Sequence, residues 1–332
     1  MDNLEWLQQV SEPILEPDLP ICDPHHHLWY RSTNRYLLDE ILSDTGSGHR
    51  IVSTVFVECS SMYREGVSKD MAPVGETEFV QGIAAMSASG QFGPTRIASG
   101  IVGFADLMLG SSVKPVLEAH CQASVQRFKG IRHAAGWHES VEINNSHTNP
   151  PQGLMLRDEF REGMSVMDDM GLVFDAWFYH HQIPEFVDLA RAFPNVTMVL
   201  DHFAGPIGIG PYRGQKEAVF NDWKENITEL KDCNNVYFKL GGINMKRNGY
   251  DWHKREVPPS SDELVDATAA YYEHCIDTFG VNRCMFESNF PVDRDSCSYA
   301  VLWNAFKKMT SSKSEEERLA LFHDTAVSAY RL

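Results

Sequence analysis

The sequence lacks the features that would place the protein in a membrane or in an oxidising compartment. No apolar run reaches the roughly 18 residues of a membrane-spanning helix. The seven cysteines are odd in number and include no Cys-x-x-Cys pair, which argues against a disulfide framework and against a zinc–thiolate module. The first residues are acidic and polar and lack the basic stretch of a signal peptide. These absences predict a cytoplasmic protein.

Basic charge and a phosphate-binding loop are also missing. The chain has 29 Lys and Arg against 46 Asp and Glu, a net charge of −17, which disfavours nucleic acid or an anionic membrane as the main partner. The segment Asp23–His27 follows the first apolar run, where a dinucleotide-binding fold would carry a glycine-rich loop. We therefore expect a small-molecule substrate as the partner and leave open whether the chain forms a homo-oligomer.

The chain does contain eight short apolar runs that alternate with helical patterns. A length of 332 residues allows two average domains or one α/β barrel. Parallel strands need crossover helices, so the alternation predicts βα units that close into a (β/α)8 TIM barrel. We expect a single barrel domain over residues 21–332 after a lead-in of residues 1–20. The first run ends near residue 27, and the other seven cover residues 51–59, 97–104, 125–133, 172–181, 197–202, 236–243 and 284–289.

Helical patterns occupy the segments between these runs. Ser260 with Glu263, and Ser314 with Glu317, have the spacing of a capping box at the start of a helix. The other helices are expected around residues 77–87, 111–123, 157–169, 183–193, 215–231 and 298–309.

Polar side chains gather at the carboxyl ends of the runs, which is where a TIM barrel carries its active site. Residues two apart on a strand point to the same side, so His25 and His27 project together and can ligate one metal ion or bind a carbonyl oxygen. A lone strand-end histidine is more often structural, but this many polar strand ends favour a catalytic mouth. The group comprises His25, His27, Glu58, Arg132, His133, Tyr179, His180, His181, His202, Lys239, Glu287, Asn289 and Asp293.

Six segments in order along nearly the whole chain resemble the amidohydrolase superfamily. They cover residues 22–29, 128–133, 174–184, 199–206, 283–293 and 321–332. The likeness is to the amidohydrolase-related branch, near the sugar and pyrone-dicarboxylate lactonases and more distantly the metal-dependent decarboxylases. It implies a distorted barrel and a Zn²⁺ or other divalent metal site. The likeness implies His25 and His27 as the first-strand metal-ligand pair. The next two imidazoles would come from His202 and from a fifth-strand histidine, either His180 or its neighbour His181, with His180 favoured by the likeness.

The eighth strand departs from the family pattern. Many relatives carry Ser-Asp-Trp-Pro where this chain has Ser288-Asn289-Phe290-Pro291, and that aspartate is a metal ligand and general base. An amide cannot accept a proton at neutral pH, although its oxygen can still ligate or accept a hydrogen bond. We therefore expect Asp293, and after it His202, as the substitute base at a catalytic site that includes Asn289. A metal-free site is the alternative, since some lactonase relatives use no metal.

Three functions remain open at this point. The first is a hydrolase acting on a lactone, ester-like or amide bond in a small carboxylated molecule. By resemblance, Arg132 would anchor the carboxylate or lactone oxygen, and Tyr179 and Glu58 complete the expected substrate-binding residues. The second is a metal-dependent decarboxylase (lyase) of an aromatic or enol acid, which needs no water nucleophile and tolerates Asn289 better. The third is a catalytically silent ligand-binding barrel.

Overall fold

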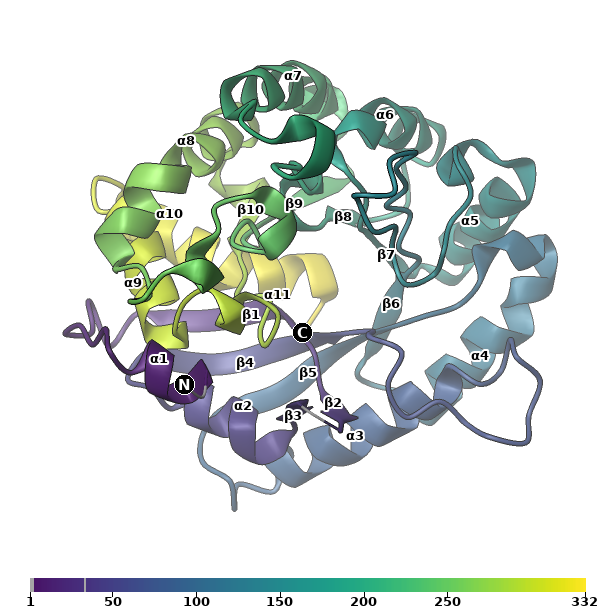
Figure 1. Cartoon of the computed structure of the whole chain (residues 1–332). Helices are drawn as coiled ribbons and strands as arrows, with labels where there is room; N and C mark the ends of the chain where they lie inside the picture. The colour runs from purple at the N-terminus through teal and green to yellow at the C-terminus, as the bar shows by residue number, and fades with distance from the viewer. Residues whose placement is uncertain (1–2, 33) are drawn as a thin grey trace.

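The centre of the molecule is a barrel of eight parallel strands (Figure 1). The computed structural model describes residues 3–32 and 34–332. The order around the sheet follows the chain, β1-β4-β5-β6-β7-β8-β9-β10. The strands are β1 (Pro20–His26), β4 (Arg50–Val57), β5 (Arg96–Gly103), β6 (Phe128–Arg132), β7 (Val173–Ala176), β8 (Met198–Leu200), β9 (Val236–Leu240) and β10 (Cys284–Phe286).

Backbone contacts close the ring between the segment after β10 and the first strand. His26 forms an isolated parallel bridge with Phe290. The Asn289 amide donates to the His25 carbonyl at 3.0 Å, and the His27 amide donates to the Phe290 carbonyl at 2.8 Å. The predicted (β/α)8 barrel is therefore confirmed, and the end of the eighth strand is held directly against the His25–His27 segment.

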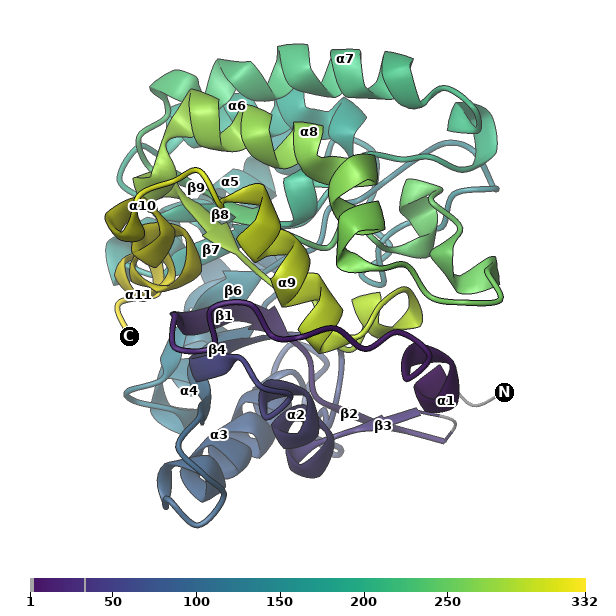
Figure 2. The same cartoon turned by 90° about the vertical axis from the view of Figure 1, so that its left-hand side faces the viewer.

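Helices surround the barrel on its outside (Figure 2). Both predicted capping boxes, Ser260 with Glu263 and Ser314 with Glu317, are formed. No helix within residues 3–32 and 34–332 is long and apolar enough to span a membrane. The helices are α1 (Asn3–Leu7), α2 (Leu38–Thr45), α3 (Val74–Ala88), α4 (Lys114–Ala123), α5 (Asp158–Met170), α6 (Ile183–Ala192), α7 (Lys216–Thr228), α8 (Ser261–Phe279), α9 (Tyr299–Met309), α10 (Glu315–Leu319) and α11 (Thr325–Tyr330).

The last helix packs against side chains of the barrel strands. Ala326, Ala329 and Tyr330 of α11 form one buried cluster with residues from several strands, among them Val55 and Val173. Figure 2 shows α11 at one end of the barrel and α1 near the other. The hydroxyl of Tyr330 reaches Asp175 Oδ2 at 2.7 Å. The carboxyl-terminal helix therefore supports the polar residues of the barrel interior.

Some local features differ from the sequence-based expectation. The apolar run at 284–289 forms a strand only over Cys284–Phe286. The apolar run at 172–181 forms a strand only over Val173–Ala176, because the chain then turns into a short 3₁₀ helix, His180–Gln182, where the Gln182 side chain accepts from the Tyr179 amide at 3.2 Å. An apolar run does not distinguish a strand from a buried turn. A small antiparallel pair, β2 (Trp29–Arg31) and β3 (Asn34–Tyr36), was not predicted.

Candidate functional site

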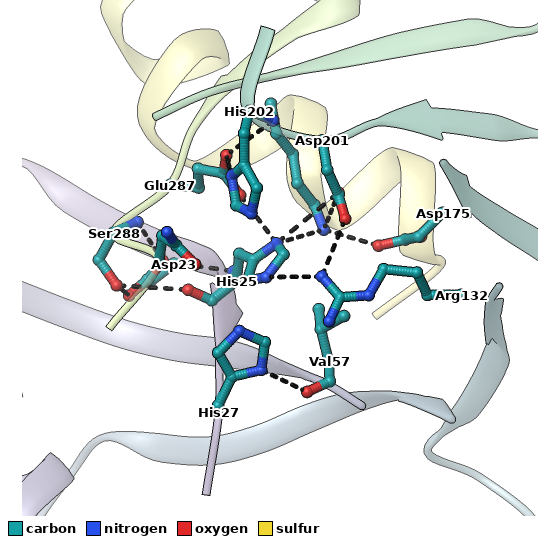
Figure 3. A network of polar contacts seen from close by, with 12 residues as sticks. Asp23, His25, His27, Val57, Arg132, Asp175, Asp201, His202, Glu287 and Ser288 are labelled. Carbon is teal, nitrogen blue, oxygen red and sulfur yellow. Dashed lines mark hydrogen bonds and ion pairs between the residues drawn. The ribbon is translucent and has the colours of Figure 1, made fainter. Parts of the chain in front are cut away.

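A buried polar network lies at the carboxyl ends of the strands (Figure 3). Its side chains come from seven barrel strands, all but β5, or from the residues that directly follow them. None of these side chains belongs to a residue more than 5% exposed. Such burial is costly for charged groups unless they are paired or bind an ion. The members are His25, Glu58, Arg132, Asp175, Asp201, His202, Lys239 and Glu287.

Two histidines and a glutamate form the centre of this network. His25 Nδ1 lies 2.9 Å from Glu287 Oε2, and His202 Nδ1 lies 2.5 Å from Glu287 Oε1. One ligand atom from each residue falls within 4.8 Å of the other two, a grouping found nowhere else in the described part of the chain. Glu287 Oε2 is buried and has no hydrogen bond. Two imidazole nitrogens and a carboxylate oxygen are a donor set that fits Zn²⁺.

The protonation states of the two imidazoles suit metal ligation. Burial, reinforced by the charge of Lys239, lowers the pKa of His25 well below its usual value. Burial also lowers the pKa of His202 to about 3. Both imidazoles are therefore neutral at pH 7, which is the form that ligates a metal. Burial raises the pKa of Glu287 well above its usual value, partly against the attraction of Lys239. A bound cation would favour the ionised form of Glu287.

Lys239 is a buried cation that holds two carboxylates beside this centre. Its Nζ lies 2.6 Å from Asp175 Oδ2, 3.0 Å from Asp201 Oδ1 and 3.2 Å from His25 Nδ1. Burial alone would lower the pKa of Lys239, but Asp175 and Asp201 outweigh it and raise that pKa. Burial would likewise raise the pKa of Asp201, yet Lys239 together with His202 and Arg132 lowers it. Asp201 is therefore an ionised carboxylate next to His25.

Arg132 is occupied by protein partners. Its Nε donates to Glu58 Oε1 at 2.8 Å, its Nη2 to the Glu58 carbonyl at 2.7 Å, and its Nη1 to Asp201 Oδ2 at 3.3 Å. Burial would raise the pKa of Glu58, but Arg132 and His147 lower it to about 2. His147 reaches Glu58 Oε2 at 2.9 Å from the long loop after β6. Arg132 and Glu58 thus form a buried ion pair beneath that loop.

Backbone geometry explains how His202 reaches Glu287. His202, Phe203 and Ala204 have φ values of 54°, 56° and 56°, a left-handed conformation that non-glycine residues seldom adopt and that concentrates at functional sites. A Cβ on Gly242 would lie 2.1 Å from His202 Nδ1, and one on Gly241 would lie 2.2 Å from the Glu287 carbonyl oxygen. The Gly241-Gly242 pair after β9 therefore leaves room for both groups.

The other expected site residues are placed as follows. The ring of His27 lies 5.0 Å from that of His25, and its Nδ1 lies 2.8 Å from the Val57 carbonyl. His180 Nδ1 accepts from the Ile207 amide at 3.3 Å, and neither His180 nor His27 supplies an atom to the His25–His202–Glu287 group. Asn289 donates through its side chain to Asp293 Oδ1 at 2.9 Å.

Sequence reasoning included Glu287 and Lys239 in the strand-end group but gave them no specific role, and it assigned none to Asp201 or to the glycine pair. The available signal for Glu287 and Lys239 was their position as polar strand-end residues. Glu287 precedes Asn289 by two positions, so a strand would direct both to the same side. The sequence carried no signal for the contact between Gly242 and His202, because the two residues come from different strand ends.

Known proteins resemble this chain in sequence and in fold. A family model described as Amidohydrolase matches residues 22–332. The chain is 32% identical to the uncharacterized protein y4mH of Sinorhizobium fredii over 95% of this chain and 99% of that protein. It is 24% identical to an L-fucono-1,5-lactonase of Burkholderia ambifaria over 82% of this chain and 80% of the relative. A crystal structure of an amidohydrolase from Burkholderia multivorans with bound zinc superposes with a TM-score of 0.71 at 22% identity, covering 94% and 99% of the two chains. This chain belongs to the amidohydrolase family.

Proposed function

We propose that the protein is a hydrolase that opens a lactone, or a related acyl bond, in a small molecule. The reaction would use a divalent metal ion, with Zn²⁺ as the first candidate, held by His25, His202 and Glu287. The observation that carries the proposal is that two neutral imidazoles lie against the same buried carboxylate, His202 at Oε1 and His25 at Oε2, and that Oε2 forms no hydrogen bond. A metal ion bound there would polarise the substrate carbonyl and lower the pKa of a water molecule.

The surrounding residues supply the remaining requirements of hydrolysis. Asp201 is our candidate for the group that accepts the proton of the attacking water, because Lys239 and Arg132 keep it ionised at 3.6 Å from His25 Nδ1. Asp293, the base suggested by the sequence, accepts a hydrogen bond from the Asn289 side chain instead. Asn289 supports the site through its backbone, which donates to the His25 carbonyl.

The comparison with known proteins supports a lactone over an amide substrate. Two relatives that match this chain are named L-fucono-1,5-lactonase. Structural neighbours named 5-carboxyvanillate decarboxylase are 11% identical and share the fold only.

The proposal can be tested with zinc-loaded protein and a panel of sugar lactones and carboxylated lactones. Glu287→Gln keeps the size of the side chain but removes its charge, and we expect kcat/KM to fall at least about 100-fold. The matched control is Glu256→Gln, at an exposed position outside the network. Full activity in Glu287→Gln, or undiminished activity after complete removal of metal, would contradict the proposed metal-dependent hydrolysis.

A further inference from the structure

A second arginine near the network lies in a cavity and not in an ion pair. The cavity has a volume of about 280 Å³. Its walls combine apolar side chains with polar ones, and the one carboxylate among them, Asp295, is neutralised by Lys246 at 2.7 Å. The lining residues are Ile143, Ile209, Met245, Val292, Asn144, Tyr179, Lys246, Arg247 and Asp295. A small space that combines apolar walls with a few polar groups is the usual form of a ligand site.

We propose that Arg247 binds a carboxylate of the substrate in this cavity. The inference rests on the proposed lactone hydrolysis, which concerns the reacting end of the substrate, and adds a carboxylate at the other end of the substrate. The substrate class would then be a small cyclic ester that carries a carboxylate, as distinct from a neutral sugar lactone.

The first argument is that Arg247 has binding capacity left over. Within residues 3–32 and 34–332, no ion pair engages its guanidinium, whereas the neighbouring Lys246 is paired with Asp295 at 2.7 Å. One nitrogen, Nη1, donates to the Tyr179 hydroxyl oxygen at 2.6 Å. The remaining donors of the planar fork match the two oxygens of a carboxylate.

The second argument is that Arg247 is held in place. The Tyr179 hydroxyl donates its own proton to the Asn144 carbonyl, so its oxygen is correctly set to accept from Arg247. The guanidinium carbon also lies 5.5 Å from the ring centres of both Tyr179 and Trp177, a distance at which a cation is attracted to an aromatic face. Tyr179 is therefore a positioning residue for Arg247.

The third argument is that Arg247 lies close to the histidine centre. The ring of Trp177 lies 4.9 Å from that of His202, and the guanidinium carbon of Arg247 lies 5.5 Å from a ring centre of the same Trp177. A substrate with one end at His202 and the other at Arg247 would therefore need to span only about the width of one side chain. Arg132, by contrast, is 5% exposed and has protein partners on all three of its nitrogens, so it cannot take a substrate carboxylate without breaking the pair with Glu58.

The test compares paraconate, a five-membered lactone with one carboxylate, with its neutral methyl ester. In Arg247→Met, KM for paraconate should rise roughly 10- to 100-fold, the usual loss for a hydrogen bond to a charged group, while KM for the ester stays within about two-fold. Arg247→Lys should restore part of the loss because it keeps the charge but not the fork. Arg213→Met, the same substitution at an exposed arginine, is the control and should change neither value.

A binding measurement separates this inference from the proposed hydrolysis. Calorimetric titration with glutarate, an open dicarboxylate, should show binding to the wild-type protein and to Arg213→Met but not to Arg247→Met. If glutarate binding depends on Arg247 in this way but the protein hydrolyses no lactone, Arg247 is supported as a carboxylate site and the proposed activity is contradicted. Equal loss for paraconate and its ester, or equal glutarate binding by wild type and Arg247→Met, would overturn the inference.

Discussion

Replacing Gly242 with alanine should disable the proposed metal site without removing any of its proposed ligands. The added Cβ would lie 2.1 Å from His202 Nδ1 and 2.5 Å from its Cγ. Carbon and nitrogen atoms that are not bonded need more than about 3 Å, so the imidazole must move by about 1 Å or more. A shift of that size takes a ligand outside the distances that zinc accepts, which vary by only about 0.2 Å.

The substitution also strains the backbone, and a matched variant separates the two effects. Gly242 has a φ of 65°, which costs an alanine about 1–2 kcal/mol. Gly214 has a similar φ of 77°, but a Cβ added there would meet no atom within 4 Å. Both variants should therefore lose about 1–2 kcal/mol in the free energy of unfolding from strain alone, measured by denaturant titration.

Zinc affinity, measured by competition with a chromophoric chelator, should then fall at least about 100-fold in Gly242→Ala. It should remain unchanged in Gly214→Ala. Equal zinc affinity in the two variants would show that His202 is not a ligand or that its ring is not fixed by Gly242, and would refute the reasoning.

Two further predictions concern residues that support the fold. Burial lowers the pKa of His120 to about 4 in the folded protein. As the pH falls below about 6.5, this histidine is therefore protonated in the unfolded state but still neutral in the folded state. The free energy of unfolding should drop by about 1 kcal/mol because of this residue between about pH 7 and pH 5.5. Denaturant titrations should show a shallower pH dependence in His120→Gln; an identical slope would contradict the assignment. Tyr330→Phe removes the 2.7 Å hydrogen bond to Asp175 and should lower the free energy of unfolding by about 1–3 kcal/mol. An unchanged midpoint in denaturant unfolding would contradict this prediction.

The barrel could be predicted from the sequence because its signals are local. Apolar runs bounded by turns, and capping boxes such as Ser260 with Glu263, depend on residues close in the chain. The run at 172–181 was one exception, since its second half is a buried turn fixed by Gln182 and not a strand. Burial alone made that segment apolar.

The site could be predicted only as far as chain topology brings residues together. Strand ends of a barrel share one face, so the proximity of His25, His27 and His202 follows from their positions. Which partner each side chain contacts depends on register and rotamer. The sequence therefore could not show that Arg132 is fully paired with Glu58 and Asp201.

Glu287 illustrates the same limit at the centre of the site. The replacement of an expected aspartate by Asn289 directed attention to Asp293, which lies four positions further along. The structure instead places the carboxylate of Glu287 between His25 and His202, in the space left by Gly241 and Gly242.

Metal content measured by plasma mass spectrometry on protein purified without added metal tests the central claim most directly. The His25–His202–Glu287 group predicts about one divalent ion per wild-type chain and a small fraction of that in Glu287→Gln. A wild-type protein that neither carries a divalent ion nor binds zinc on titration would contradict it.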